Sequence, residues 1–146
     1  MGFSSQDDKR GAIRVAIVGN DPFGRRDLAD RLERRADLEV VENIDSVDSA
    51  MSVLPRSGAH VVVIDDHLLG LGASSLCRRL DAAGCRIPCI VHASLPPDSG
   101  TIAGWAAAAV VLKSLVGDQL EAEIRRLADV LGERPQAMSP AVSSTN

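Results

Sequence analysis

Aromatic residues are almost missing from this sequence. Its 146 residues include no tyrosine, one tryptophan and two phenylalanines, so aromatics make up only 2% of the chain. Apolar residues still amount to 45% and charged residues to 25%, as in an ordinary soluble globular protein. The length suits one domain with a single sizeable core. We therefore expect a core of Val, Leu, Ile and Ala.

The features of membrane, secreted and nucleic-acid-binding proteins are also missing. The longest apolar stretch, residues 102–112, is too short and too rich in alanine to span a bilayer. The polar N-terminus has no apolar core of a signal peptide. A net charge of −4 gives no overall basic field. We expect a cytoplasmic protein that contacts no membrane and binds DNA only through a local patch or another domain.

The three cysteines leave an odd one in any pairing. Cys85 and Cys89 lack the two-residue spacing of a redox or zinc pair, and Cys77 completes no second pair. This pattern predicts reduced thiols in a cytosolic setting, placed in the core or on the surface.

Short apolar runs alternate with segments of helical periodicity along the chain. The alternation predicts parallel βαβ units, and right-handed crossovers favour the flavodoxin-like strand order 2-1-3-4-5 with five helices. We expect a disordered lead at 1–11, one domain at 12–132 and a flexible tail or linker at 133–146. The expected strands are 13–18, 38–41, 61–64, 87–91 and 110–112.

The ends of the helices carry recognisable signals. Asp21 and Pro22 are a typical N-cap and first helical residue, and Asp45 or Ser46 caps a second helix. Two further helices are expected at 73–83 and about 101–107. The last runs from a cap at Ser114 to Gly132.

The central stretch runs Val61-Val62-Val63-Ile64 and then directly into Asp65 and Asp66. Such a run predicts a strand buried on both faces, and carboxyl ends of parallel strands are where α/β sheets place their ligands. Lys113 follows the fifth strand and should face Asp65 across this edge. A carboxylate opposite a lysine suits phosphate chemistry, although a plain salt bridge is the alternative. Strand alternation directs Asp66 away from Asp65.

With these residues the chain resembles the receiver domain of two-component response regulators, a CheY-like fold, over about residues 12–132. The strand ending at Asp65, followed by Gly70, resembles the phospho-acceptor strand and its loop. Lys113 resembles the lysine that pairs with the phosphoryl group. The first strand with Asp21-Pro22, and the tail at 137–142, resemble regulators that carry a C-terminal LuxR-type helix-turn-helix.

The resemblance implies partners and a cofactor. We expect a homodimer, a sensor histidine kinase as partner, and DNA contact only through a C-terminal domain that is absent from this chain. Family members hold Mg²⁺ with two acids after the first strand, where this chain has Gly19 and Asn20. Asp65, Asn20 and the backbone carbonyl of His67 remain, which predicts a weak or absent Mg²⁺ site and no other cofactor.

The parts of the family's switch also differ. Ala93 stands where a Thr or Ser follows the phosphoryl group, and Val110 replaces the aromatic of the fifth strand. We therefore interpret the chain as an atypical receiver that is phosphorylation-independent or weakly phosphorylated. We expect it to control an output, namely transcription, through protein–protein contacts. A functional Mg²⁺-dependent phospho-acceptor at Asp65 is the alternative. A small flavodoxin-like cofactor binder or enzyme is the third, although no Gly-rich phosphate loop or nucleophile–base pair supports it.

The remaining candidates have structural interpretations. His60 and His92 lack ligand spacing and are expected to be structural. Trp105 is expected to pack, and the arginine-rich first helix to present a solvated face.

Overall fold

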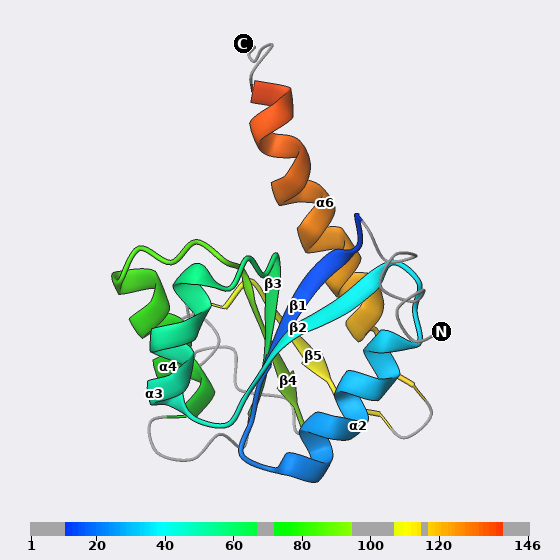
Figure 1. The fold of residues 1–146 in the computed structure, drawn as a ribbon, viewed down its shortest axis with the longest axis vertical. Coiled ribbons are helices and arrows are strands. Elements are labelled where there is room, and N and C mark those ends of the chain that lie inside the picture. Colours follow the sequence, from blue (N-terminus) through cyan, green and yellow to red (C-terminus); the bar gives the residue numbers. More distant parts are fainter. Residues whose placement is uncertain (1–10, 67–71, 95–106, 115–116, 139–146) are drawn as a thin grey trace.

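The computed structural model describes residues 11–66, 72–94, 107–114 and 117–138. Its centre is a five-stranded parallel sheet in the order β2-β1-β3-β4-β5 (Figure 1). This confirms the predicted flavodoxin-like topology. The strands are β1 (Ile13–Val18), β2 (Leu38–Ile44), β3 (Val61–Asp65), β4 (Cys89–Ala93) and β5 (Ala109–Leu112).

Helices cover both faces of the sheet. Figure 1 shows α3 and α4 on one side and α2 and α6 on the other. The predicted helix at about 101–107 lies outside the described residues except for residue 107, which is not helical. His67, Gly70 and Trp105 also lie outside them. Within the described residues the helices are α2 (Pro22–Glu33), α3 (Val47–Val53), the 3-10 turn η1 (Leu54–Arg56), α4 (Gly72–Ala82) and α6 (Leu120–Met138). None of these helices is long and apolar enough to cross a bilayer.

Two aliphatic layers form the core, one on each face of the sheet. On the α2 and α6 side, Val63 of β3 and Ile90 of β4 pack with Leu32 and Ile124. On the α3 and α4 side, Ile64 belongs to the other layer, as strand alternation requires. The buried hydrophobic side chains among the described residues include no aromatic ring. The expectation from composition is thus met there.

Capping side chains fix the beginnings of two helices. Asp21 Oδ1 accepts a hydrogen bond from the Phe23 backbone N–H at 3.1 Å, and Pro22 occupies the first helical position. Ser46, rather than Asp45, caps α3, because its Oγ accepts from the Ser49 N–H at 3.1 Å. The two predicted N-caps are therefore in place, and the structure resolves the choice between Asp45 and Ser46.

The bounds of the last helix were wrong. The sequence predicted a helix from Ser114 to Gly132, whereas α6 begins at Leu120 and continues to Met138. Gly117 has a φ of +113°, which interrupts helical geometry before the helix begins. At the other end, the cost of a single glycine, about 1 kcal/mol, is too small to stop a helix.

Several strand bounds also differ from the prediction, and the largest differences are in β4 and β2. β4 begins at Cys89 instead of residue 87, because Pro88 has no N–H to donate to a ladder. Its carbonyl still accepts from the Val62 N–H at 3.0 Å. β2 continues to Ile44, past the predicted end at Val41, with an irregularity in its pairing with β1 between Val15 and Ala16.

Candidate functional site

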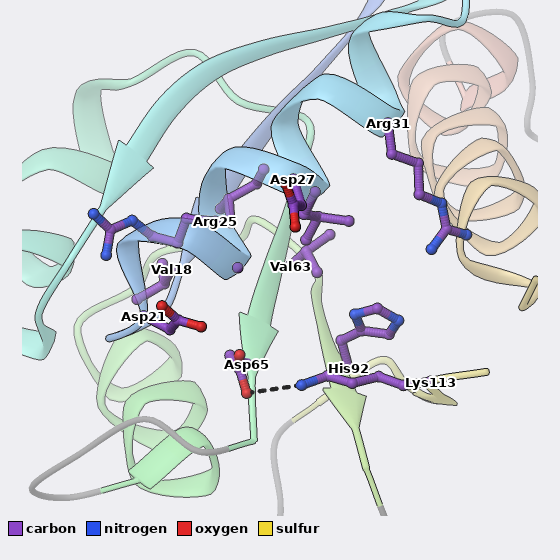
Figure 2. Close-up of a pocket in the computed structure, with 12 residues that line it drawn as sticks. Val18, Asp21, Arg25, Asp27, Arg31, Val63, Asp65, His92 and Lys113 are labelled. Carbon is purple, nitrogen blue, oxygen red and sulfur yellow. Dashed lines mark hydrogen bonds and ion pairs between the residues drawn. The ribbon is translucent and has the colours of Figure 1, made fainter. Parts of the chain in front are cut away.

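Asp65 is the last residue of β3 and lies at the carboxyl edge of the sheet. Its strand runs between β1 and β4, and in register it pairs with His92. The carboxylate is partly exposed and lines a cavity of about 300 Å³ beneath α2 (Figure 2). The cavity has an aliphatic floor that includes Ile17 and Val63 and a charged rim. A carboxylate at this place is available to a small reactant.

Lys113 follows β5 and reaches back across β4 to Asp65. Its Nζ lies 3.2 Å from Asp65 Oδ1, the interaction drawn as a dashed line in Figure 2. The Lys113 backbone N–H donates to the Ala93 carbonyl at 2.7 Å, which anchors the residue to the end of β4. The structure thus brings together the carboxylate and the ammonium group that the strand pattern placed at one edge.

Asp66 does not point away from this pair, contrary to the expectation from alternation. Its Oδ1 lies 3.7 Å from Lys113 Nζ, and its Oδ2 accepts a hydrogen bond from the Ser94 N–H at 2.8 Å. The reason is that β3 ends at Asp65, so the backbone leaves the pleat and alternation no longer applies. One ammonium group therefore faces two carboxylates.

Gly19 packs directly against Asp65. A Cβ built at Gly19 would lie 3.2 Å from Asp65 Cβ and 3.5 Å from Arg25 Cγ. Arg25 covers this point from α2, and its guanidinium donates to the Gly19 carbonyl at 2.7 Å and to Asn43 Oδ1 at 2.5 Å. Asn20 follows and is half-buried. The crowding at Gly19 gives no signal in the sequence.

Ala93 and Val110 both contribute to the aliphatic layer on the α3 and α4 side. Ala93 is buried there, and Val110 packs against the same layer from β5. Neither residue carries a polar atom on its side chain. Ser94, one residue along, is exposed and uses its backbone N–H to bind Asp66.

The described residues are a poor match for a tight Mg²⁺ site. Mg²⁺ favours several hard oxygen ligands and gives up its waters reluctantly. Here Asp65 and Asp66 both lie beside the Lys113 ammonium group. Gly19 supplies no side-chain oxygen, and within the described ranges no three Asp, Glu, His or Cys side chains gather as metal ligands. The His67 carbonyl, one of the predicted ligands, lies outside those ranges.

A charged cluster beside the cavity was not anticipated. Arg31 of α2 binds Asp118 at 2.5 Å and Glu121 at 2.6 Å, at the beginning of α6. His92 of β4 lies 2.9 Å from the second Asp118 oxygen. Arg31 and His92 also line the cavity (Figure 2). These residues come from parts of the chain that are far apart in sequence. The cluster forms only because α2, β4 and the beginning of α6 lie side by side in the fold.

The cluster changes the acidity of its two carboxyl groups. Burial alone would raise the pKa of Asp118, but hydrogen bonds from Arg31, His92 and the Leu120 N–H outweigh it and hold that pKa far below its usual range. The Arg31 hydrogen bond likewise lowers the pKa of Glu121. Both acids therefore stay ionised, and the ion pairs tie α2 to α6. His92 has a structural partner, in line with its structural interpretation.

These features define the class of protein. A doubly wound 2-1-3-4-5 sheet carries an aspartate at the end of its central strand, paired with a lysine that follows the last strand. This is the architecture of the flavodoxin-like fold to which CheY also belongs.

Comparison with known proteins agrees with this class, although no family model matches. The chain is 25% identical over 118 residues to a nitrate/nitrite response regulator homologue of Haemophilus influenzae. That match covers 80% of this chain and 57% of the relative, so the chain spans little more than half of the relative's length. The receiver domain of Klebsiella pneumoniae RstA is 25% identical, with a TM-score of 0.65, covering 79% of this chain and 97% of that one. The receiver domain of Francisella response regulator 1452 has a TM-score of 0.70 at 17% identity, covering 81% and 98%.

The chain therefore has the fold of response-regulator receiver domains, and its sequence is similar to that of a response regulator.

Proposed function

We propose that this receiver domain signals without depending on Mg²⁺-assisted phosphorylation of Asp65. The position of Lys113 carries the proposal. Its ammonium group lies 3.2 Å from Asp65 and 3.7 Å from Asp66, so it already offsets the negative charge that would otherwise attract a metal. The role assigned to Lys113 is therefore to neutralise the site as well as to pair with any phosphoryl oxygen.

The neighbouring positions support this assignment. A dication at Asp65 would be repelled by the Lys113 ammonium group. Two unit charges about 4 Å apart interact by about 4 kcal/mol at an effective dielectric of 20, so this repulsion would weaken metal binding. Asn20 offers a neutral amide, and Gly19 offers no side chain. An acid at Gly19 would meet Asp65, because even a Cβ there lies 3.2 Å from Asp65 Cβ. Asp21 already caps α2.

The switch positions support it as well. A phosphoryl group adds about −1.5 to −2 charge units and must move something to be sensed. Ala93 has no hydroxyl group to follow it, and Val110 has no ring to reorient. Both pack into the aliphatic layer on the α3 and α4 side. We assign them as degenerate switch positions.

The output in this proposal is carried by protein–protein contacts. We propose a cytoplasmic signalling role rather than an enzymatic one, with homodimerisation and a sensor histidine kinase as partner. The controlled process is transcription, through a DNA-binding domain outside residues 12–132. The H. influenzae relative has further length that this chain does not match, and the structural neighbour RcsB of Salmonella enterica was solved bound to promoter DNA.

The alternative is a Mg²⁺-dependent phospho-acceptor. It is favoured by the partial exposure of Asp65 in the cavity and by its contact with Lys113. The structural neighbour TrrA of Thermotoga maritima was solved with Mg²⁺ and BeF. In this alternative Asn20, Asp65 and the His67 carbonyl would hold the ion weakly, and the ion would neutralise charge during phosphoryl transfer.

One experiment separates the two. The protein is incubated with Mg²⁺ and acetyl phosphate, and its intact mass is compared with that of Asp65→Asn and of the control Asp66→Asn. We expect no phosphoryl adduct in any of them, and no saturable change in Trp105 emission during a Mg²⁺ titration. An adduct that Asp65→Asn loses and Asp66→Asn keeps would overturn the proposal.

Two further measurements sharpen the result. Asn20→Asp introduces an acid next to Gly19, the residue that packs against Asp65, so this variant should bind Mg²⁺ more tightly than the natural sequence does. Absorbance of the purified protein tests the third possibility, because a bound flavin or nucleotide would indicate a cofactor-binding protein instead.

A further inference from the structure

All three cysteines of the chain line one small cavity, on the side of the sheet that α3 and α4 cover. The cavity has a volume of about 180 Å³. Cys77 comes from α4, Cys85 follows the turn after this helix, and Cys89 is the first residue of β4. The sequence spacing gave no pair, whereas the fold brings the three thiols to one place. All three are free in the structure.

Cys77 and Cys89 form a thiol pair within this cluster. Their side chains are 1% and 4% exposed and belong to the same aliphatic layer. Both residues line the same small cavity, and Cys89 Sγ lies 3.7 Å from the Ile87 carbonyl oxygen. Cys85 packs against the layer but is only half-buried. The pair thus joins a helix to the strand beneath it.

The two thiols differ in acidity. The neighbouring Cys89 thiol lowers the pKa of Cys77, whereas the Cys77 thiol and burial raise the pKa of Cys89. The thiolate is the reactive form of cysteine. Cys77 is therefore the thiol suited to attack an oxidant, and Cys89 is placed to react next.

We propose that Cys77 and Cys89 form a reversible disulfide on reaction with a hydroperoxide. The Cys77 sulfur attacks one peroxide oxygen, the O–O bond breaks, and water (or an alcohol from an organic peroxide) leaves. Cys89 then attacks the sulfur of the resulting sulfenic acid, the S–O bond breaks, and a second water leaves. Two thiols lose two electrons and two protons, and the peroxide is reduced. A dithiol reductant reverses the reaction by exchange.

Such a disulfide would act on α4, the helix that follows Asp65 along the chain. α4 begins at Gly72, and the bond would hold its middle turn to the amino end of β4. A chemical signal could then reach this helix without any change at Asp65. The inference is independent of the proposed function, because neither cysteine lines the Asp65 cavity.

The test counts free thiols after mild oxidation. The full chain is treated with a small excess of hydrogen peroxide, denatured, alkylated and weighed, and its peptides are mapped. Reduced protein should take up three labels, and oxidised protein one, on Cys85. The mapped link should join Cys77 to Cys89, and dithiothreitol should restore three labels. Three labels after oxidation, a link that includes Cys85, or oxygen addition in place of the link would overturn the proposal.

Variants give a second, independent measurement. Cys77→Ser should abolish the link, and Cys85→Ser, the matched control in the same cavity, should keep it. If Cys77→Ser fails to fold, the thermal unfolding of Cys85→Ser decides. Its oxidised form should melt several degrees above its reduced form, because a cross-link restricts the unfolded chain. Equal midpoints would contradict a bond between α4 and β4.

Discussion

Replacing Asp118 by asparagine tests the cluster that ties α2 to α6. Asp118 is 4% exposed and accepts hydrogen bonds from Arg31, His92 and the Leu120 N–H. Asparagine keeps the shape but loses the charge. Removing one partner of a fully buried pair costs about 3–5 kcal/mol. Arg31 is 26% exposed and keeps Glu121, so we expect a smaller loss of about 2–3 kcal/mol at pH 7.

The pH dependence of this loss follows from the lowered pKa of Asp118. Because the folded-state pKa lies below the unfolded value of about 4, the carboxylate stabilises the fold fully above that value. This stabilisation disappears as the pH falls toward the folded-state pKa. The difference between the natural protein and Asp118→Asn should therefore be largest near neutral pH and shrink below about pH 4.

The assay is urea unfolding at several pH values, followed by circular dichroism. Asp37→Asn is the matched control, because Asp37 also binds an arginine, Arg125, through two hydrogen bonds of 2.7 and 3.1 Å. These side chains are 52% and 40% exposed, so their pair should contribute less than about 1 kcal/mol. Equal losses in the two variants, or a loss for Asp118→Asn that does not change with pH, would refute the reasoning.

Three further predictions concern single positions. His60 should titrate below its ordinary pKa of 6.5 in an NMR titration, because burial and the nearby Arg14 disfavour the charged ring. In the neutral ring, Nδ1 accepts a hydrogen bond from the Arg14 backbone N–H at 2.9 Å. Stability from this contact is then present above pH 6.5 and falls as the pH drops below it, and His60→Gln should flatten that dependence. Gly19→Ala should destabilise the fold by about 1 kcal/mol, measured by urea unfolding, since the new Cβ would lie 3.2 Å from Asp65 Cβ. An unchanged midpoint would show that Asp65 can move aside without cost. Ser46→Ala should lower the thermal midpoint through a lost N-cap of about 1 kcal/mol, an effect that Ser46→Asp should not show.

The topology of the sheet and the contact between Asp65 and Lys113 could be predicted from the sequence alone. Runs such as Val61 to Ile64 are readable because a strand buried on both faces needs apolar residues throughout. Parallel pairing then brings strand ends together. The direction of the Asp66 side chain could not be predicted, because it depends on the residue at which β3 ends. The Arg31 cluster could not be predicted either, because it depends on how α2 and α6 are placed relative to each other. The same holds for Cys77 of α4 and Cys89 of β4, which the fold brings into one aliphatic layer.

The length of α6 has a mechanical consequence. Its 19 residues extend about 28 Å at 1.5 Å per residue, and the end of the helix projects past the sheet (Figure 1). Because one residue turns a helix by about 100°, any segment that follows Met138 has its direction set by the residue count of α6. Inserting a single residue in the projecting part would swing that segment to another side, while inserting seven would nearly restore its direction about 10 Å farther away. The ion pairs of Arg31 hold the N-terminal end of α6, so a small tilt of the helix there produces a larger displacement at its C-terminal end.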